Sequence, residues 1–137
     1  MSKWAKVNRA RARKPKGTLS GPARAFAALL ALRQAAGEVS WWRVHPGSLR
    51  LAEGVRYEPD FAYVNDVGEV AYVEVKGPRG FGLDAESRTK WRAAGDLFPW
   101  ARFEAVVMSR GGLVVSTEVY EPALGAARVR EDREDMA

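Results

Sequence analysis

Three charged residues lie in one predicted hairpin, the stretch RYEPDFAYVNDVGEVAYVEVKG at residues 56–77. Asp60 belongs to its first extended run, and Glu74 and Lys76 belong to its second run. Two carboxylates that lie close together repel each other unless a positive charge lies between them. Mg²⁺ or Mn²⁺ fits this need, because hard cations bind carboxylate and carbonyl oxygens and keep several waters. With Lys76 as an acid–base partner or a stabiliser of developing charge, these groups suit phosphodiester hydrolysis by water.

The turn between the two runs determines which residues face each other. Residues 66–68, Asp-Val-Gly, suit a three-residue hairpin loop that ends with glycine in the left-handed conformation. With the flanking residues paired across this loop, Asp60 lies opposite Glu74 on one face. Period-two alternation places Lys76 on the same face. A bulge at Pro59 would change this register.

A structural alternative is an ion pair at the sheet edge, between Lys76 and Glu74 or Asp60. The Glu-x-Lys tripeptide is common, and exposed ion pairs contribute little to stability. Two observations favour a function: the turn signal independently places a second carboxylate opposite Glu74, and Gly77 leaves room for a backbone or a ligand to approach.

The segments YEPDFAYV and YVEVKG together resemble the active-site signature of the PD-(D/E)XK nuclease superfamily. Within that superfamily the pattern is similar to phage endonucleases and to phage and archaeal Holliday junction resolvases. The resemblance covers residues 22 to about 108, and the positions that match the motif are Pro59, Asp60, Glu74 and Lys76. It implies a restriction-endonuclease-like α/β core, with a central mixed β-sheet flanked by helices. It also implies Mg²⁺ or Mn²⁺ bound by Asp60, Glu74 and the Val75 backbone carbonyl, and a catalytic Lys76.

The resemblance has two further implications. Related proteins carry a basic residue in the helix after the motif that contacts a DNA phosphate. The matching residue here is Lys90, and its neighbours are Arg88 and Arg92. Many members also place an acid in the first helix, whereas residues 21–36 contain none. The candidates to replace that acid as a metal ligand are Glu38 and Glu58.

The elements around the hairpin predict a single nuclease domain over residues 20–121. Apolar residues at helical spacing, Ser20 as a cap and Gly37 as a stop predict a helix over residues 22–36. A second helix is predicted from Asp84 to about Phe98. Besides the two runs of the hairpin, the predicted strands are 39–44, 48–52, 102–109 and 113–120. This order of elements favours a mixed sheet with packed helices.

The net charge of +5 is unevenly distributed along the chain. The first 17 residues carry +7 with no acid, and the remaining residues carry −2. Residues 1–19 are therefore predicted to form a basic flexible arm that binds DNA, with a solubility tail as the alternative. The candidate DNA-binding residues outside the helix are Arg11, Arg13, Lys14, Lys16 and Arg79. For Arg79 a solvated loop is equally consistent with the sequence, and residues 122–137 are predicted to form a charged tail.

The composition excludes several classes of site. The chain has no cysteine and one histidine, His45, which rules out thiolate metal sites and argues against a histidine-rich zinc site. No apolar stretch reaches the roughly 20 residues that span a bilayer, so we expect a soluble protein in the cytoplasm, that of the host cell if a phage encodes it.

The leading hypothesis is a divalent-metal-dependent endonuclease that cuts branched DNA, a Holliday junction resolvase acting as a homodimer. The alternatives are a nuclease acting on nicked, linear or single-stranded DNA, and a non-catalytic nucleic-acid-binding protein with the same fold.

Overall fold

The computed structural model describes residues 19–78, 85–121 and 126–131, with side chains described for residues 19–78 and 85–120. These residues form helices α2 (Gly21–Ala35) and α3 (Ala85–Leu97). The strands are β1 (Val39–Val44), β2 (Leu49–Ala52), β3 (Val55–Tyr57), β4 (Phe61–Asn65), β5 (Val70–Lys76), β6 (Arg102–Met108), β7 (Val114–Glu121) and β8 (Ala126–Glu131).

The main sheet has six strands in the order β1-β4-β5-β6-β7-β8. Strands β5 and β6 are parallel and are joined through α3, whereas the other neighbours are antiparallel. A parallel pair needs such a crossover connection, and a helix is its usual form. The predicted α/β class with a mixed central sheet is confirmed.

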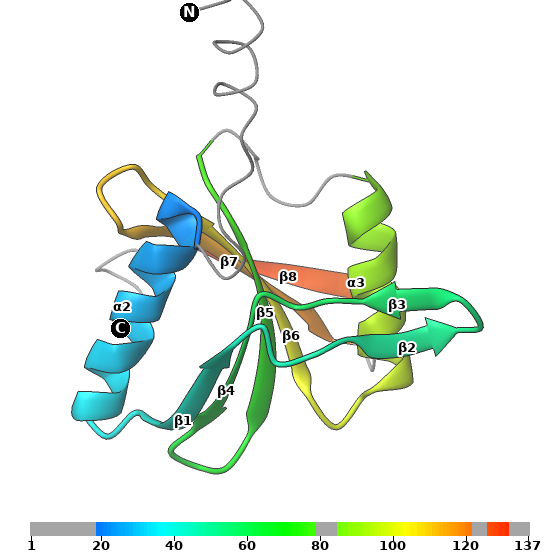
Figure 1. Cartoon of the computed structure of the whole chain (residues 1–137), viewed down its shortest axis with the longest axis horizontal. Helices are drawn as coiled ribbons and strands as arrows, with labels where there is room; N and C mark the ends of the chain where they lie inside the picture. The colour runs from blue at the N-terminus through cyan, green and yellow to red at the C-terminus, as the bar shows by residue number, and fades with distance from the viewer. Residues whose placement is uncertain (1–18, 79–84, 122–125, 132–137) are drawn as a thin grey trace, which may run out of the picture.

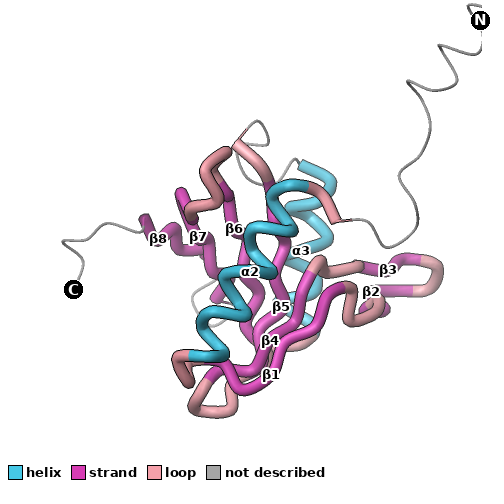
Figure 2. The backbone as a smooth tube through the Cα atoms, turned by 60° about the vertical axis from the view of Figure 1, so that its left-hand side comes forward, coloured by secondary structure: helices cyan, strands magenta, loops and turns pink. Residues whose placement is uncertain are grey.

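The two helices cover opposite faces of the sheet (Figure 1, Figure 2). On one face, Phe26 and Leu30 of α2 pack with Phe61, Val73 and Met108. On the other face, α3 packs with the ends of β3, β6 and β7, and the buried residues there include Tyr57, Trp91, Ala94, Phe103 and Tyr120. Any residue of β5 can therefore be assigned to the α2 side or to the α3 side by its position in the alternation.

The first helix has the cap and the stop that its sequence predicts. The Ser20 hydroxyl accepts a hydrogen bond from the Ala23 N–H at 3.3 Å, and Pro22 lies in the first turn. Gly37, just after the helix, has a φ of 81°, a conformation that favours glycine. The predicted helix over residues 22–36 is thus confirmed as α2, shifted by one residue at each end.

The hairpin register predicted from the turn is also confirmed. Gly68 has a φ of 86°, and the Asn65 N–H donates to the Glu69 carbonyl at 3.0 Å. The paired residues run from Val64 with Val70 to Phe61 with Val73. Asp60 and Glu74 are the next residues beyond this last pair, one in each run of the hairpin.

The first run of the hairpin differs from its prediction, because it divides into two strands. Tyr57 ends β3, which pairs with β2 in a separate two-stranded sheet, and Phe61 begins β4 in the main sheet. Between them Pro59, which has no N–H to donate, is buried. The Asp60 N–H donates to the Val73 carbonyl at 2.9 Å, although Val73 is already the partner of Phe61. The Asp60 backbone therefore bonds one residue away from Glu74, its predicted partner, while the register from Phe61 to Val64 is as predicted.

Two other features differ from the sequence interpretation. Residues 126–131 form β8 on the open edge of β7, where the sequence suggests a charged tail. The unpaired backbone groups of an edge strand can pair with such a segment whatever its side chains. Next to the motif, a Cβ added to Gly77 would lie 3.0 Å from Cγ of Pro22. The room beside Gly77 is thus occupied by the first turn of α2.

Candidate active site

Asp60 is fixed by its backbone and by its side chain. Its N–H donates to Val73, and its carbonyl accepts from the His45 N–H at 2.9 Å. Its Oδ2 accepts a hydrogen bond from the Val75 N–H at 2.8 Å. A hydrogen bond from a backbone N–H to a carboxylate is of the stronger kind. The half-buried Asp60 carboxylate is thereby tied to the strand that carries Glu74.

Glu74 and Lys76 lie on the α3 side of β5. Ala71, Val73 and Val75 are buried in the core beneath α2, so the alternating residues between and after them face the other way. Both Glu74 and Lys76 are half-buried. That Asp60, Glu74 and Lys76 meet at one end of the β4–β5 hairpin remains a prediction; the structure places Glu74 and Lys76 on one side of β5 and ties Asp60 to the Val75 N–H between them.

A pocket of about 340 Å³ opens beside Glu74. It lies between the end of β3, the middle of β5 and the first turns of α3. The described residues that line it are Arg56, Tyr57, Glu58, Glu74, Ser87 and Lys90. Asp60 and Lys76 lie outside this described lining. The pocket combines two acids with two basic side chains, so its groups can contact both a cation and an anion.

Tyr57 is a residue of this pocket that the sequence analysis did not identify. Its side chain is only 3% exposed, and its hydroxyl has no hydrogen-bond partner among the described residues. Burial raises the pKa of Tyr57, and the negative charges of Glu74 and then Asp60 raise it further. The phenol is therefore protonated and can donate a hydrogen bond. The sequence shows only that Tyr57 lies two residues before Pro59 of the motif. It does not predict that the hydroxyl lines the pocket.

The basic residues predicted after the motif have three different settings. Lys90 is half-buried and lines the pocket. Arg88 makes a two-pronged ion pair with Glu118 of β7, with Nη2 3.0 Å from Oε2, and this bond raises the pKa of the guanidinium. Arg92 is exposed. Lys90 is thus the helix residue best placed to contact a ligand. The candidates that lie outside the described residues are Arg11, Arg13, Lys14, Lys16 and Arg79.

The two candidates for a third acid lie at different ends of the hairpin. Glu58 is exposed and lines the pocket with Glu74. The Glu38 carbonyl accepts from the Asp66 N–H at the turn, six residues along the hairpin from Asp60. At about 3.3 Å per residue this separation is roughly 20 Å. Glu58 therefore lines the pocket beside Glu74, whereas Glu38 lies at the turn end of the hairpin.

The donors present suit a hard cation held by few protein ligands. No group of three or more histidine, cysteine, aspartate or glutamate side chains that could hold a metal ion occurs in the described part of the chain. Mg²⁺ is commonly held by one or two carboxylates, together with waters and substrate phosphates. Asp60 and Glu74, with a backbone carbonyl beside them, fit that pattern.

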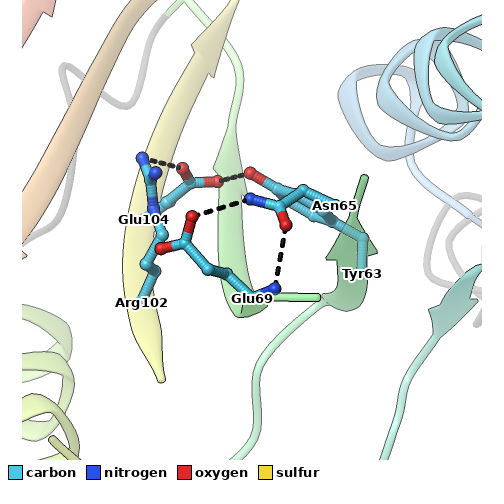
Figure 3. A network of polar contacts seen from close by, with 5 residues as sticks. All are labelled: Tyr63, Asn65, Glu69, Arg102 and Glu104. Atoms are coloured by element: carbon cyan, nitrogen blue, oxygen red, sulfur yellow. Dashed lines mark hydrogen bonds and ion pairs between the residues drawn. The ribbon is translucent and has the colours of Figure 1, made fainter. Parts of the chain in front are cut away.

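A second polar network lies on the opposite face of the sheet (Figure 3). Glu104, 5% exposed, accepts a hydrogen bond from the Tyr63 hydroxyl at 2.6 Å and one from Arg102 Nη2 at 3.1 Å. Asn65 and Glu69 close the hairpin turn nearby through a side-chain bond of 3.1 Å. Because both oxygens of the Glu104 carboxylate have partners, we assign this network to stability.

No protein-family model matches this chain, and no curated protein is similar to it in sequence. In the part of the chain that the structure describes, neither helix has the length and apolarity required to cross a membrane.

Proposed function

We propose that this protein is a divalent-metal-dependent DNA endonuclease with a restriction-endonuclease-like core. The observation that supports the proposal most is the β4–β5 register, in which Asp60 comes one residue before the last pair, Phe61 with Val73, and Glu74 one residue after it, with Lys76 two residues further along β5. The bond from the Val75 N–H to Asp60 supports it, because it fixes one acid against the strand that carries the other. An ion pair of Lys76 with Glu74 or Asp60 that served only the structure would not require this hydrogen bond from the Val75 N–H to the Asp60 carboxylate.

Asp60, Glu74 and the Val75 carbonyl would hold Mg²⁺ or Mn²⁺, and Glu58 is the candidate for a further acid. A carboxylate has two oxygens, so the hydrogen bond at Oδ2 of Asp60 is compatible with a cation at Oδ1. A cation bound there supplies Lewis-acid activation of water and of the scissile phosphate.

The other residues of the site would act on the phosphate and on the leaving group. Lys76, on the face of Glu74, would stabilise the charge that develops on the phosphate oxygens or give a proton to the leaving oxygen. Lys90 would attract a phosphate into the pocket and position it. The fixed Asp60 carboxylate needs no reorganisation during the reaction, which is how preorganised groups lower a barrier.

The proposed substrate is branched DNA, with the four-way Holliday junction as the leading candidate. The sequence resemblance and the basic N-terminal arm support this choice. Symmetric cutting of a four-way junction requires two sites, so the active form is proposed to be a homodimer.

One observation favours a second candidate function, a DNA-binding protein that has lost catalysis. Helix α2 carries no acid, and no acidic group larger than a pair occurs at the site in the described residues. Such a protein would bind DNA without hydrolysing it.

Digestion of four DNA substrates side by side tests these proposals. A four-way junction, a nicked duplex, a linear duplex and a single strand would be incubated with the protein in Mg²⁺ and, as a control, in EDTA. We expect paired, Mg²⁺-dependent cuts near the branch point of the junction. Faster cutting of another substrate would contradict junction specificity and leave the nuclease proposal standing. No cutting of any substrate in Mg²⁺ or Mn²⁺, with DNA binding retained, would favour the non-catalytic alternative.

A further inference from the structure

The Tyr57 hydroxyl is a buried donor placed where a ligand would bind. It lines the pocket with Glu74, Ser87 and Lys90, and it has no hydrogen-bond partner among the described residues. Leaving a buried donor without a partner costs free energy, so native proteins rarely keep one without a reason. A ligand that brings an acceptor oxygen into the pocket would remove that cost.

The other groups of the pocket indicate the chemical class of the ligand. Ser87 and Lys90, one turn apart on α3, contribute a hydroxyl and an ammonium group to the lining of the pocket, and Tyr57 contributes its hydroxyl from β3. All three are hydrogen-bond donors, and Lys90 also carries positive charge. An oxyanion with several acceptor oxygens matches this set, and a phosphate of DNA is the oxyanion that the proposed nuclease would bind.

We infer that the Tyr57 hydroxyl is a substrate-binding group that donates a hydrogen bond to a non-bridging oxygen of a DNA phosphate in this pocket. The inference rests on the proposed nuclease function. It assigns the phosphate a contact on β3, in addition to the contact from Lys90 on α3. The small sheet formed by β2 and β3 would thereby take part in holding DNA.

The test compares two tyrosine-to-phenylalanine variants. Tyr57→Phe keeps the ring, which packs 6.3 Å from Phe103 between centroids, and removes only the hydroxyl. Tyr120→Phe is the matched control, because its hydroxyl donates to Asp96 at 2.6 Å and lies outside the described pocket lining. For each variant we would measure single-turnover cleavage of a four-way junction in Mg²⁺, DNA affinity in Ca²⁺ by fluorescence anisotropy, and the melting temperature.

We expect opposite patterns in the two variants. Tyr57→Phe should cleave about tenfold more slowly, with an unchanged or higher melting temperature, because the lost hydroxyl makes no described bond within the protein. Tyr120→Phe should melt at a lower temperature and cleave at the wild-type rate. Wild-type cleavage by Tyr57→Phe would overturn the inference and leave the nuclease proposal intact.

DNA affinity tests the Tyr57 inference even if the nuclease proposal fails. If the wild-type protein cut no DNA, the nuclease proposal would fail, and DNA affinity in Ca²⁺ would decide the inference. Binding weakened at least about threefold in Tyr57→Phe alone would support the phosphate contact. Equal affinity of Tyr57→Phe and wild type, or no DNA binding by the wild type, would overturn it.

Discussion

Asp60 occupies a position where the chain leaves one sheet and enters another. Its backbone groups bond to Val73 and His45, and its carboxylate bonds to the Val75 N–H. These three bonds explain how an acid can be held at the end of an apolar strand without disrupting it. They also mean that asparagine, whose Oδ1 can accept the same N–H, should preserve the local structure while removing the charge.

The buried Glu104 carboxylate gives a residue-level prediction for stability. Tyr63→Phe removes the hydroxyl that donates to Oε1 and leaves a buried charge with Arg102 as its remaining described partner. We expect the free energy of unfolding to fall by about 1–3 kcal/mol. DNA cleavage should be unchanged, because Tyr63 faces α2, on the other side of the sheet from the pocket. Urea unfolding followed by tryptophan fluorescence measures the first quantity, and a junction cleavage assay measures the second. An unfolding free energy equal to wild type would contradict this account of Glu104.

Local turn chemistry made the hairpin register predictable from the sequence. The loop at residues 66–68 fixes the pairing as far as Phe61 with Val73, and Asp60 and Glu74 are the next residue in each run. The phenol of Tyr57, the pairing of Arg88 with Glu118 and the burial of Glu104 were not predictable. Each depends on contacts between strands or helices distant in sequence, which no local pattern encodes.

The packing of α3 against β7 depends on a glycine, Gly95. A Cβ added to Gly95 would lie 2.2 Å from Cδ1 of Tyr120, closer than carbon atoms can approach. Gly95→Ala should therefore displace α3 or the Tyr120 ring and destabilise the protein by about 1–3 kcal/mol. The matched control is Gly21→Ala in α2, where a Cβ would meet nothing within 4 Å.

Thermal and urea unfolding of the two alanine variants would check this. Gly21→Ala should be neutral or should raise stability by up to about 1 kcal/mol, since alanine favours a helix more than glycine does. Equal stabilities of the two variants would show that α3 and Tyr120 can accommodate a Cβ at residue 95, and would contradict the dependence on Gly95.

The helices and most strands could be predicted because their patterns are local. Strand β1 has the bounds predicted from its sequence, and α2 has the predicted cap at Ser20. The division of the first hairpin run at Pro59 was not predicted, because the sequence reads as one extended run from residue 56 to the turn. In the structure Val55–Tyr57 instead form a short local hairpin with β2, whose turn contains Gly54 with a φ of 72°. The pairing of β8 was missed for a different reason: its partner is the open edge of β7, and charged residues there suggested a tail.

The positive charge of the chain is concentrated in its N-terminal arm. The first 17 residues carry +7, and the remainder carries −2. If the arm binds DNA, deleting residues 1–17 should weaken binding to every DNA structure. The slope of log K against log salt should fall by up to about six, the value for seven phosphate contacts.

Anisotropy titrations over a range of salt concentrations would measure this slope for the full chain and for the truncated chain. Cleavage by the truncated chain at saturating concentration should persist, because the proposed catalytic groups lie just before β4 and on β5. An identical salt slope for the two chains would assign the arm to solubility.

If Asp60 and Glu74 hold a divalent cation for hydrolysis, substitutions that remove their charge should greatly weaken both cation binding and cleavage. The variants are Asp60→Asn and Glu74→Gln, and the matched controls are Asp66→Asn at the hairpin turn and Glu86→Gln in α3, both exposed. We would measure single-turnover cleavage in Mg²⁺, with calorimetric titration of Mn²⁺ on the same samples.

We expect each site variant to lose about a hundredfold or more in cleavage rate and to bind Mn²⁺ weakly, while it folds and binds DNA normally. The two control variants should cleave and bind Mn²⁺ as the wild type does. Cleavage at the wild-type rate by Asp60→Asn or by Glu74→Gln would contradict the assignment of the site.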